Sequence, residues 1–482
     1  MPLPPRRVLP DFMRNRSMPR TEIVWVSLSE LTEKHYLCAD NKQLSAQKHN
    51  TNGHKRTSCN SPRHPTITTD SRNCPAGSIF FALKGESFDG NRFAAAALEK
   101  GCAYAVVDNP EVAADKRYIL VDDCLATFQA LAREHRRQFD IPVIGITGTN
   151  GKTTTKELVA AVLSEKYRVH CTQGNFNNDI GVPKTLFGLK PEHQIAVVEM
   201  GASHPGDIKR LAETAEPTCG IITNVGKAHL MGFGSFEGVI RTKGELYDYL
   251  RQREGSKVFI NAGDEHLAGI STGLDLVRYG LTGTEGLAVE GRVTDCSPML
   301  HFEWRAGGGK WHTVQTQLIG SYNVLNMLAA ACIGVSFGVD EDCISHALAA
   351  YKPSNNRSQL EVTPHNKLIV DTYNANPTSM AAALRNFREM NVSPKMAILG
   401  SMSELGDASA EEHQKVADAL DRCGIGTVWL VGDEFGRTEC PYRKFATVDD
   451  VKAEIRRNRP EGQYILIKGS HSQRLYELPE LL

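Results

Sequence analysis

A lysine and a threonine that follow a glycine-bearing turn have the side chains with the most specific chemistry in this sequence. Lys152 and Thr153 come directly after the turn 147–151. The apolar run over 141–146 predicts a buried strand before the turn, and the apolar spacing over 156–163 predicts a helix after it. In this layout, backbone N–H groups and the positive end of the helix bind phosphate. The lysine reaches the terminal phosphates and the threonine binds Mg²⁺, so the pattern predicts a nucleoside triphosphate site.

The loop is a variant of the regular phosphate-binding motif. That motif has a glycine five residues before Gly151, where this chain has Ile146. Gly145 lies one residue too early to replace it. The strand and helix expected on the two sides of the loop still favour nucleotide binding over a chance match.

Two more candidates follow the next strands expected along the chain. Glu199 ends the apolar run 195–198, and a carboxylate at a strand end beside a phosphate loop is well placed to hold Mg²⁺. The alternative is a solvated glutamate at a strand end. His229 follows the strand expected over 219–223, and its position fits a structural role and a ligand role equally well.

Further polar residues suggest a function only when they are considered together with the phosphate loop. Lys243 is expected at or near a helix start, and by composition it is an exposed lysine. Asn323 and Asn326 are one helical turn apart and could face a base edge or cap a helix. Arg357 could reach the triphosphate, and Asp371, at the end of a strand, suits a ribose hydroxyl. Together they suggest ATP bound at a domain junction.

Composition bounds the class of protein. A chain of 482 residues suggests about three domains, and 41% hydrophobic with 23% charged residues is ordinary for a soluble globular protein. A net charge of −1 gives no case for nucleic-acid binding. The 12 cysteines form no Cys-x-x-Cys pair, so neither a zinc site nor a disulfide framework is indicated. No run approaches 18 apolar residues, so membrane insertion is not expected.

Two segments lack the pattern of folded structure. Residues 1–20 are rich in arginine and have no apolar core, which excludes a secretory signal. They are expected to be a basic disordered tail, or to precede a true start at Met13 or Met18, with a transit peptide as the alternative. Residues 40–64 are polar and predict a disordered insertion.

Strands alternate with helices along the rest of the chain, which predicts an α/β protein. The central part is expected to contain a mainly parallel sheet with an antiparallel excursion over 287–318, and the last part a Rossmann-like sheet. The divisions expected are 1–20 for the tail, 21–139 for a first α/β domain containing the insertion, 140–353 for the ATP-binding domain and 354–482 for the last domain.

Short motifs of one enzyme family occur in order from Asp70 onward. The most specific are Asn-Asn-x-x-Gly-x-Pro over 177–183 and Tyr-Asn-Ala-Asn-Pro over 373–377. The others are at 70–72, 80–85, 89–90, 148–154, 199–201, 224–229, Lys243, 323–326, Arg357, Asp371, 399–400 and 404–406. On these motifs the chain resembles the Mur ligases, ATP-dependent amide-forming enzymes of peptidoglycan synthesis. The resemblance implies three domains, which bind the UDP-substrate, ATP and the incoming amino component.

The resemblance implies a role for each matching residue of the ATP site. Lys152 and Thr153 would hold the triphosphate and one Mg²⁺, and Glu199 and His229 would help to bind metal. Lys243 would be carbamylated by CO₂, and the carbamate would bind a second Mg²⁺. The implied catalytic residues are Lys152, Glu199, His229 and Lys243. The implied ATP-binding residues are Gly148, Thr149, Asn150, Gly151, Lys152, Thr153, Thr154, Asn323 at the adenine, Arg357 at the γ-phosphate and Asp371 at the ribose.

The motifs favour the branch of the family that adds D-Ala-D-Ala to UDP-MurNAc-tripeptide. The tripeptide carboxylate would attack the γ-phosphate to give an acyl phosphate, and the amine of D-Ala-D-Ala would then displace phosphate. Closure of the last domain would exclude water. The UDP-substrate residues implied are Ser71, Arg72, Lys84, Asp89, Asn175, Asn177 and Asn178. We expect a cytoplasmic monomer, and the third residue of the tripeptide stays open between meso-diaminopimelate and lysine.

Three residues depart from the usual family pattern. Asn91 replaces a histidine after Asp89-Gly90 and concerns the uridine site. Ser401 replaces an aspartate and His471 replaces an arginine, and both concern the dipeptide site.

Three other interpretations compete with this one. The sibling enzyme that adds the third amino acid has an Asp-Asn-Pro-Arg motif in its last domain. Here Asp-Asn-Pro occurs only at 108–110, in the first domain, and is followed by Glu111. Folylpolyglutamate synthetase shares the ATP core but not the 70–72 region. A non-catalytic nucleotide-binding regulator would be expected to lack Lys152, Glu199 or Lys243, and all three are present.

Overall fold

The computed structural model describes residues 66–85, 87–353 and 359–482. The tail expected over 1–20, the insertion expected over 40–64 and Arg357 lie outside the described residues. The chain divides into two compact units between Glu134 and His135, and each unit is described by itself.

The first unit contains a small parallel sheet. Its four strands have the order β1-β2-β5-β6, and a separate two-stranded antiparallel ribbon follows β2 in the chain. The strands are β1 (Ile67–Thr68), β2 (Ile79–Phe81), β3 (Lys84–Gly85), β4 (Phe88–Asp89), β5 (Tyr104–Val107) and β6 (Tyr118–Leu120), and the helices are α2 (Ala94–Glu99) and α3 (Cys124–Arg137), which continues into the second unit. Phe81 and Phe128 pack with ring centroids 5.1 Å apart, which fixes α3 on the sheet.

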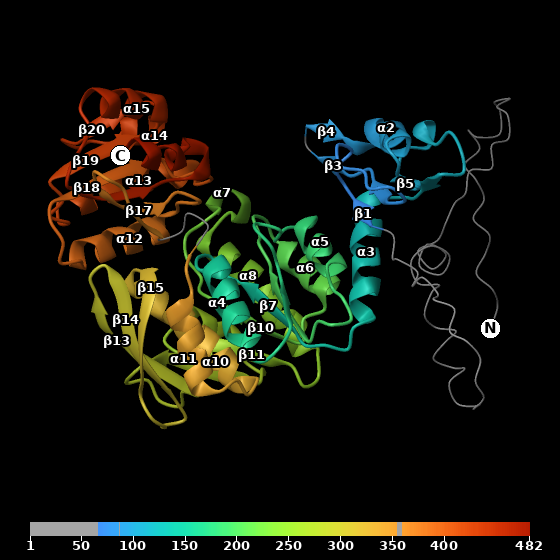
Figure 1. Cartoon of the computed structure of the whole chain (residues 1–482), viewed down its shortest axis with the longest axis horizontal. Coiled ribbons are helices and arrows are strands. Elements are labelled where there is room, and N and C mark those ends of the chain that lie inside the picture. The colour runs from blue at the N-terminus through green and yellow to red at the C-terminus, as the bar shows by residue number, and fades with distance from the viewer. Residues whose placement is uncertain (1–65, 86, 354–358) are drawn as a thin grey trace. The chain divides into compact units, whose positions relative to one another are not determined.

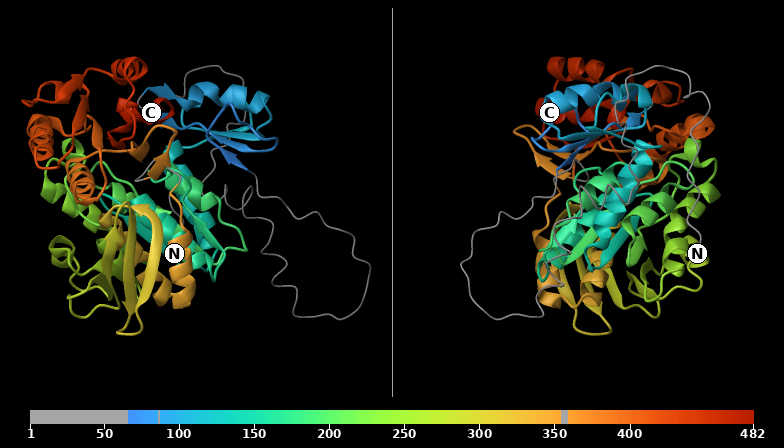
Figure 2. Two further views of the ribbon diagram at one scale, coloured as in Figure 1. Left: turned by 60° about the vertical axis from the view of Figure 1, so that its left-hand side comes forward. Right: turned by 90° about the vertical axis from the view of Figure 1, so that its right-hand side faces the viewer.

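The second unit begins with a nine-stranded sheet, called here the central sheet, with the order β15-β14-β13-β12-β11-β10-β7-β9-β8. Its strands are β7 (Val143–Thr147), β8 (Val169–Cys171), β9 (Ile195–Glu199), β10 (Cys219–Ile222), β11 (Lys257–Asn261), β12 (Leu276–Leu281), β13 (Val289–Cys296), β14 (Met299–Ala306) and β15 (His312–Ile319). All neighbours from β8 to β13 pair in parallel, whereas β13, β14 and β15 pair antiparallel and lie side by side in Figures 1 and 2. The antiparallel excursion predicted from the sequence is confirmed.

Helices cover both faces of the central sheet. They are α4 (Lys152–Ser164), α5 (Gly181–Phe187), α6 (Asp207–Ala215), α7 (Leu230–Phe233), α8 (Phe236–Arg251), α9 (Glu265–Ile270), α10 (Val324–Ser336) and α11 (Glu341–Ala350). Ile144 and Ile146 of β7 pack in one buried cluster with Leu158 of α4 and Leu328 of α10. The alternate residue, Gly145, points to the other face, where a Cβ would lie 3.3 Å from the Leu246 side chain of α8.

A six-stranded sheet, called here the C-terminal sheet, has the order β16-β17-β21-β18-β19-β20 and is parallel except for β16. Its strands are β16 (Gln359–Val362), β17 (Lys367–Asp371), β18 (Lys395–Gly400), β19 (Thr427–Val431), β20 (Arg443–Phe445) and β21 (Tyr464–Lys468), and its helices are α12 (Pro377–Glu389), α13 (Ser409–Leu420), α14 (Asp433–Gly436) and α15 (Val448–Arg457). One buried cluster joins α12 and α13 to the sheet and another joins α15 to it, so both faces are covered (Figure 1).

The predicted α/β class is confirmed, and the described chain contains three parts that are each built around a sheet. In the part of the chain that the structure describes, no helix has both the length and the apolar character needed to cross a bilayer.

Candidate active site

The turn between β7 and α4 has the backbone geometry of a phosphate loop. Gly148 has φ of 141° and Gly151 has φ of 77°, values that favour glycine. A Cβ at Gly148 would lie 2.0 Å from Thr223 Oγ1, and one at Gly151 would lie 2.7 Å from Asn326 Oδ1. Both glycines are therefore required by close neighbours as well as by conformation. The helix starts at Lys152, four residues before the start expected from apolar spacing, because Gly151 turns the backbone directly into it.

Lys152 and Thr153 stand at the N-terminus of α4. Lys152 Nζ donates to the carbonyl oxygens of Gly148 at 2.7 Å and Thr149 at 3.0 Å, so its ammonium lies against the loop itself. Thr153 is buried, and its hydroxyl donates to Glu199 Oε1 over 3.1 Å. Thr154 is the next residue of the same helix and is half-buried.

Glu199 lies at the carboxyl end of β9, next to β7, where Ile146 is its register partner. Its side chain is 1% exposed. Oε1 accepts from Thr153 and from Asn177 Nδ2 at 2.8 Å, whereas Oε2 is buried and has no hydrogen-bond partner among the described residues. A buried carboxylate oxygen without a partner is costly unless a cation completes it. A carboxylate beside a hydroxyl is a donor set that suits Mg²⁺, so these residues fit a magnesium ion.

Lys243 is not at a helix start and is not exposed, so both expectations for its position were wrong. It lies in the middle of α8 and is 2% exposed, because the face of α8 that carries it packs inward. Its Nζ lies 5.4 Å from the centre of the Phe233 ring. Burial lowers the pKa of Lys243 well below its ordinary value, and the nearby positive charge of Lys152 acts in the same direction.

His229 contacts Glu404, a residue noted from the sequence only as part of the family motif at 404–406. Its Nδ1 pairs with Glu404, which comes from the loop after β18 of the C-terminal sheet. Met231 N also donates to the carbonyl oxygen of Glu404 at 3.3 Å. Burial lowers the pKa of His229 below its ordinary value, while Glu404 opposes that shift and Lys152 adds to it.

Among the residues predicted to bind metal, only Glu199 has a carboxylate in its unmodified side chain. Within residues 66–85, 87–353 and 359–482, no group of three or more histidine, cysteine, aspartate and glutamate side chains is arranged to hold a metal ion. The set Thr153, Glu199, His229 and Lys243 therefore depends on Glu199 and on any oxygen that modification of Lys243 would add.

Asn323 and Asn326 lie together beside the phosphate loop. Asn326 Nδ2 donates to Asn323 Oδ1 at 2.8 Å, and Thr155 Oγ1 donates to Asn326 Oδ1 at 3.2 Å. Asn323 Nδ2 donates to the carbonyl oxygen of Ile319 at 2.8 Å. The Asn323 side chain makes no capping bond to α10, although it occupies the N-cap position. The helix-capping alternative for Asn323 is thus not what the structure shows.

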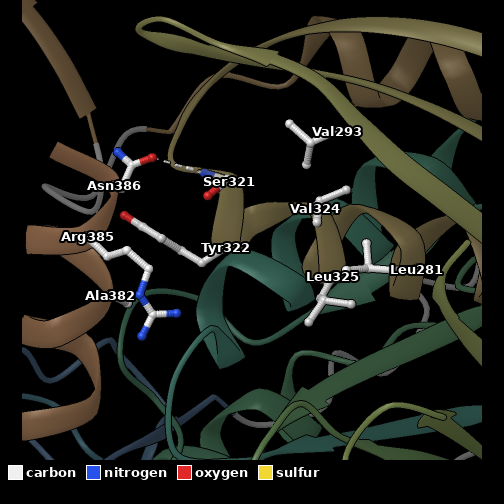
Figure 3. A pocket seen from close by; sticks show the side chains of 9 residues that line it. All are labelled: Leu281, Val293, Ser321, Tyr322, Val324, Leu325, Ala382, Arg385 and Asn386. Atoms are coloured by element: carbon white, nitrogen blue, oxygen red, sulfur yellow. Dashed lines mark hydrogen bonds between the residues drawn. The ribbon is translucent and has the colours of Figure 1, made fainter. Parts of the chain in front are cut away.

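A small pocket lies next to the segment that begins α10. It has a volume of about 240 Å³ and lies between the start of α10 and helix α12. Figure 3 shows Tyr322 and Arg385 on one side of it and the apolar Val293, Val324 and Leu325 on the other. Its volume is below the roughly 300–1,000 Å³ typical of ligand clefts, so it does not mark a site by itself.

Asp371 has a partner at the end of the adjacent strand. Lys468 Nζ pairs with Asp371 Oδ2 at 2.7 Å, and the two residues are register partners at the carboxyl ends of β17 and β21. Lys468 is 1% exposed. A lysine and an aspartate that each end a parallel strand were visible in the sequence, but their adjacency depends on the strand order.

In the first unit, a polar cluster surrounds two predicted substrate residues. Lys84 pairs with Asp108 at 2.9 Å, and the buried Asn91 donates to Asp89 at 2.8 Å and to Asp108 at 2.7 Å. Burial alone would raise the pKa of Asp108, but its bonds from Lys84 and Asn91 outweigh that and hold it below its ordinary value. Asn91, which departs from the family pattern, is therefore an ordered part of this cluster.

The remaining predicted substrate residues are placed as follows. Arg72 is exposed and pairs with Asp70 at 2.9 Å, and Ser71 O accepts from Lys100 Nζ at 2.8 Å. In the second unit, Asn178 Oδ1 accepts from Gly181 N at 2.8 Å, at the start of α5, and Asn175 O accepts from Asn177 N at 2.7 Å. Asn177, through its bond to Glu199, lies with the metal candidates.

The two residues of the last domain that depart from the family pattern, Ser401 and His471, each contact a nearby residue. Ser401 is buried and donates to the carbonyl oxygen of Val431 at 3.2 Å. His471 stacks on Tyr476 with ring centroids 4.8 Å apart.

Comparison with known proteins decides the family. Three family models match in order: "Mur ligase family, catalytic domain" at residues 65–136, "Mur ligase middle domain" at 146–334 and "Mur ligase, glutamate ligase domain" at 356–471. A relative from Bacillus subtilis strain 168, named UDP-N-acetylmuramoyl-tripeptide–D-alanyl-D-alanine ligase, is 34% identical over 86% of this chain and 92% of its own. This chain belongs to the Mur ligase family.

Other Mur ligases agree along the same length. An Escherichia coli K12 enzyme of the same name is 33% identical over 86% of this chain and 93% of its own. The crystal structure of MurF from Acinetobacter baumannii has a TM-score of 0.79 at 31% identity, covering 86% of this chain and 92% of that one. MurF ligase from Thermotoga maritima in complex with ADP has a TM-score of 0.78 at 27% identity, covering 86% and 96%. The three-domain Mur ligase fold inferred from the motifs is thus confirmed, and the chain is an enzyme of this family.

Proposed function

We propose that this chain joins D-Ala-D-Ala to the tripeptide carboxylate of UDP-MurNAc-tripeptide, with hydrolysis of ATP, in the synthesis of peptidoglycan precursors. Relatives with that name match at 34% and 33% identity over nearly their whole length. The observation that carries the catalytic part is the buried Glu199, whose Oε2 has no partner in the described chain and whose Oε1 accepts from Thr153, two residues after the phosphate-loop Gly151. A site of that kind serves phosphoryl transfer.

The residues around Glu199 support a role in holding the nucleotide. Thr153 and Glu199 would hold Mg²⁺, which supplies neutralisation of phosphate charge when bound. Lys152 and the backbone of 148–151, which includes Thr149 and Asn150, would bind the triphosphate together with Thr154 in the first turn of α4. We assign Asn323 to the adenine, Asp371 to the ribose and Arg357 to the γ-phosphate. The attack of one anion on another is the main electrostatic obstacle, and Mg²⁺, Lys152 and Arg357 would reduce it.

The burial of Lys243 supports its modification by CO₂. A neutral amine attacks CO₂, a C–N bond forms and a proton is released, leaving a carbamate that carries negative charge. Burial and the charge of Lys152 lower the pKa of Lys243, and this favours the neutral amine. The carbamate would give a second Mg²⁺ the oxygen ligands that the described side chains lack. His229 would contribute its remaining ring nitrogen, since Nδ1 pairs with Glu404.

For the UDP-substrate we assign Ser71, Arg72, Lys84, Asp89, Asn175, Asn177 and Asn178, from the family motifs that they match. We also propose the boundaries 21–139, 140–353 and 354–482 for the three domains, a monomeric state and a cytoplasmic location.

The test is phosphate release from ATP and Mg²⁺ with UDP-MurNAc-tripeptide, with and without D-Ala-D-Ala, together with the mass of the product. Release that requires the dipeptide, with a product heavier by D-Ala-D-Ala less water, is expected. Release that instead requires a free diamino acid and the UDP-dipeptide would assign the chain to the sibling branch. ATP binding without turnover of any acceptor would support a regulator.

A further inference from the structure

The first turn of α12 rests on two loops at the carboxyl end of the central sheet. Asn376 Nδ2 donates to Asn150 Oδ1 of the phosphate loop over 2.8 Å. Thr378 Oγ1 accepts from Lys227 N at 3.1 Å, in the loop that leads to His229. The C-terminal sheet therefore touches the phosphate loop and its neighbour through one helical turn.

The side chain of Asn376 serves two separate partners. Its Oδ1 accepts from Ser379 N at 2.8 Å and so caps α12, while Asn376 N donates to Ser379 Oγ at 3.1 Å to complete a capping box. Its Nδ2 is then directed to Asn150. Asn376 is 4% exposed, so water does not replace a lost partner easily. The cap uses only Oδ1, whereas the short bond to Asn150 uses Nδ2, and Asn150 Nδ2 makes a longer contact of 3.5 Å with Oδ1. A side chain that keeps the capping oxygen but lacks the amide nitrogen therefore separates the two roles.

The backbone of Asn150 is held by the central sheet. Its N–H donates to Asn224 Oδ1 at 3.0 Å, and its carbonyl oxygen accepts from Thr223 Oγ1 at 2.6 Å. Its side chain is held by Asn376 of the other sheet. The phosphate loop is thus held by hydrogen bonds from residues next to the central sheet and from the helix α12 that packs on the C-terminal sheet. Small displacements of such a loop alter the alignment of reacting groups, which has a large effect on rate.

We propose that Asn376 is a positioning residue that makes the geometry of the phosphate loop depend on docking of α12. The inference rests on the proposed function only where turnover is the readout. Coupling of this kind is reciprocal: a loop held in shape by bound nucleotide favours docking of α12, and docked α12 favours the binding shape of the loop.

Asn376→Ser is the variant that separates the two roles. Serine is among the best N-cap residues, so the capping box survives, but its side chain is too short to reach Asn150. We expect kcat to fall roughly tenfold, the upper end of what one neutral hydrogen bond carries. The midpoint of thermal unfolding should stay that of the wild type. Asn376→Asp should recover most of the rate, because the Asn150 amide can rotate and donate to the carboxylate.

A matched control and a double-mutant cycle complete the turnover test. Thr447 occupies the N-cap of α15 in a capping box of the same type, and α15 packs on the same C-terminal sheet as α12. Thr447→Ser should change neither rate nor stability. On an Asn150→Ala background, Asn376→Ser should cost no more than about twofold, because the bond is already absent. An equal loss on both backgrounds would overturn the proposal.

Hydrogen exchange of the full, nucleotide-free chain tests the same inference without turnover. Amides of 148–151 should exchange faster in Asn376→Ser than in the wild type, while those of α12 stay unchanged. Unchanged exchange in the loop would overturn the proposal, and faster exchange in α12 would show a capping defect instead. A wild-type protein that makes no product would count against the proposed function alone, because exchange still reports on the loop.

Discussion

Thr153 and Glu199 are joined by a hydrogen bond of 3.1 Å, although 46 positions separate them in the chain. The bond links the start of the helix after the phosphate loop to the carboxyl end of the neighbouring strand. It leaves the second carboxylate oxygen of Glu199 buried and without a partner in the described chain. This relationship supports the proposed cation site beside the phosphate loop.

Glu199→Gln should remove the charge that attracts Mg²⁺ but keep the shape of the side chain. The amide oxygen can still accept from Thr153 and Asn177, so we expect little change in thermal unfolding. Loss of a residue that hydrogen-bonds to a metal ligand lowers metal affinity or activity by about 10–100-fold. Loss of the ligand itself should therefore lower ATP turnover by more than about 100-fold. Phosphate release across a Mg²⁺ titration measures this. Wild-type turnover in the variant would contradict the assignment of Glu199.

Asn177→Ala provides a graded comparison at the same carboxylate. It removes one of the two bonds to Glu199 Oε1 without removing the charge. Turnover should fall by about 10–100-fold, less than in Glu199→Gln, and the Mg²⁺ requirement should shift to higher concentration. If Asn177 acts only on the UDP-substrate, the Mg²⁺ requirement should not move, and the KM for that substrate should rise instead.

Lys243 should make activity depend on CO₂. Protein kept in degassed buffer should lose ATP turnover, and bicarbonate should restore it, because the carbamate forms reversibly from a neutral amine. Lys243→Arg, which stays protonated, should be inactive and insensitive to bicarbonate. Turnover in the wild type that is the same with and without CO₂ would count against the modification.

Lys468→Met should destabilise the C-terminal sheet. It leaves Asp371 without the ammonium that lies 2.7 Å away, at a strand end where Lys468 is 1% exposed. Breaking a buried pair from one side costs about 3 kcal/mol. Chemical denaturation measures the loss, and Asp371→Asn combined with Lys468→Met should be less unstable than Lys468→Met alone. Additive losses would show that the pair is not coupled.

His413 should make stability fall in mild acid. It is buried, accepts from Met402 N at 2.9 Å through Nε2, and donates from Nδ1 to Ser409 O at 2.7 Å, so the structure requires the neutral ring. Burial lowers the pKa of His413 below 6.5. The unfolded chain then binds a proton first as pH falls through 6.5, so stability present above that pH is lost below it. Denaturation from about pH 8 to about pH 5 should show a steeper fall in the wild type than in His413→Gln.

Local patterns predicted much of the fold and the placement of several candidates. Glu199 and Asp371 were expected at the ends of strands, and the structure places them at the carboxyl ends of the apolar runs of β9 and β17. Parallel strands bury both faces, so such runs are distinctive. The loop after β7 was visible because glycine, lysine and threonine occur at fixed spacing.

Contacts between distant segments could not be predicted from those patterns. Lys243 sits among polar residues in the sequence, and its burial depends on how α8 packs. The contacts of His229 with Glu404 and of Asn150 with Asn376 join the two sheets of the second unit and have no local signal. Asn376 was noticed only as part of a family motif, and nothing in that motif indicated a contact with the phosphate loop.

The most direct test of the account follows one oxygen atom from the tripeptide. UDP-MurNAc-tripeptide is labelled with heavy oxygen at both oxygens of its terminal carboxylate and incubated with the enzyme, ATP, Mg²⁺ and D-Ala-D-Ala. The mass of the released phosphate is then measured by mass spectrometry. If the carboxylate attacks the γ-phosphate to form an acyl phosphate, one labelled oxygen leaves with each phosphate and one stays in the new amide. Unlabelled phosphate together with amide product would contradict the account.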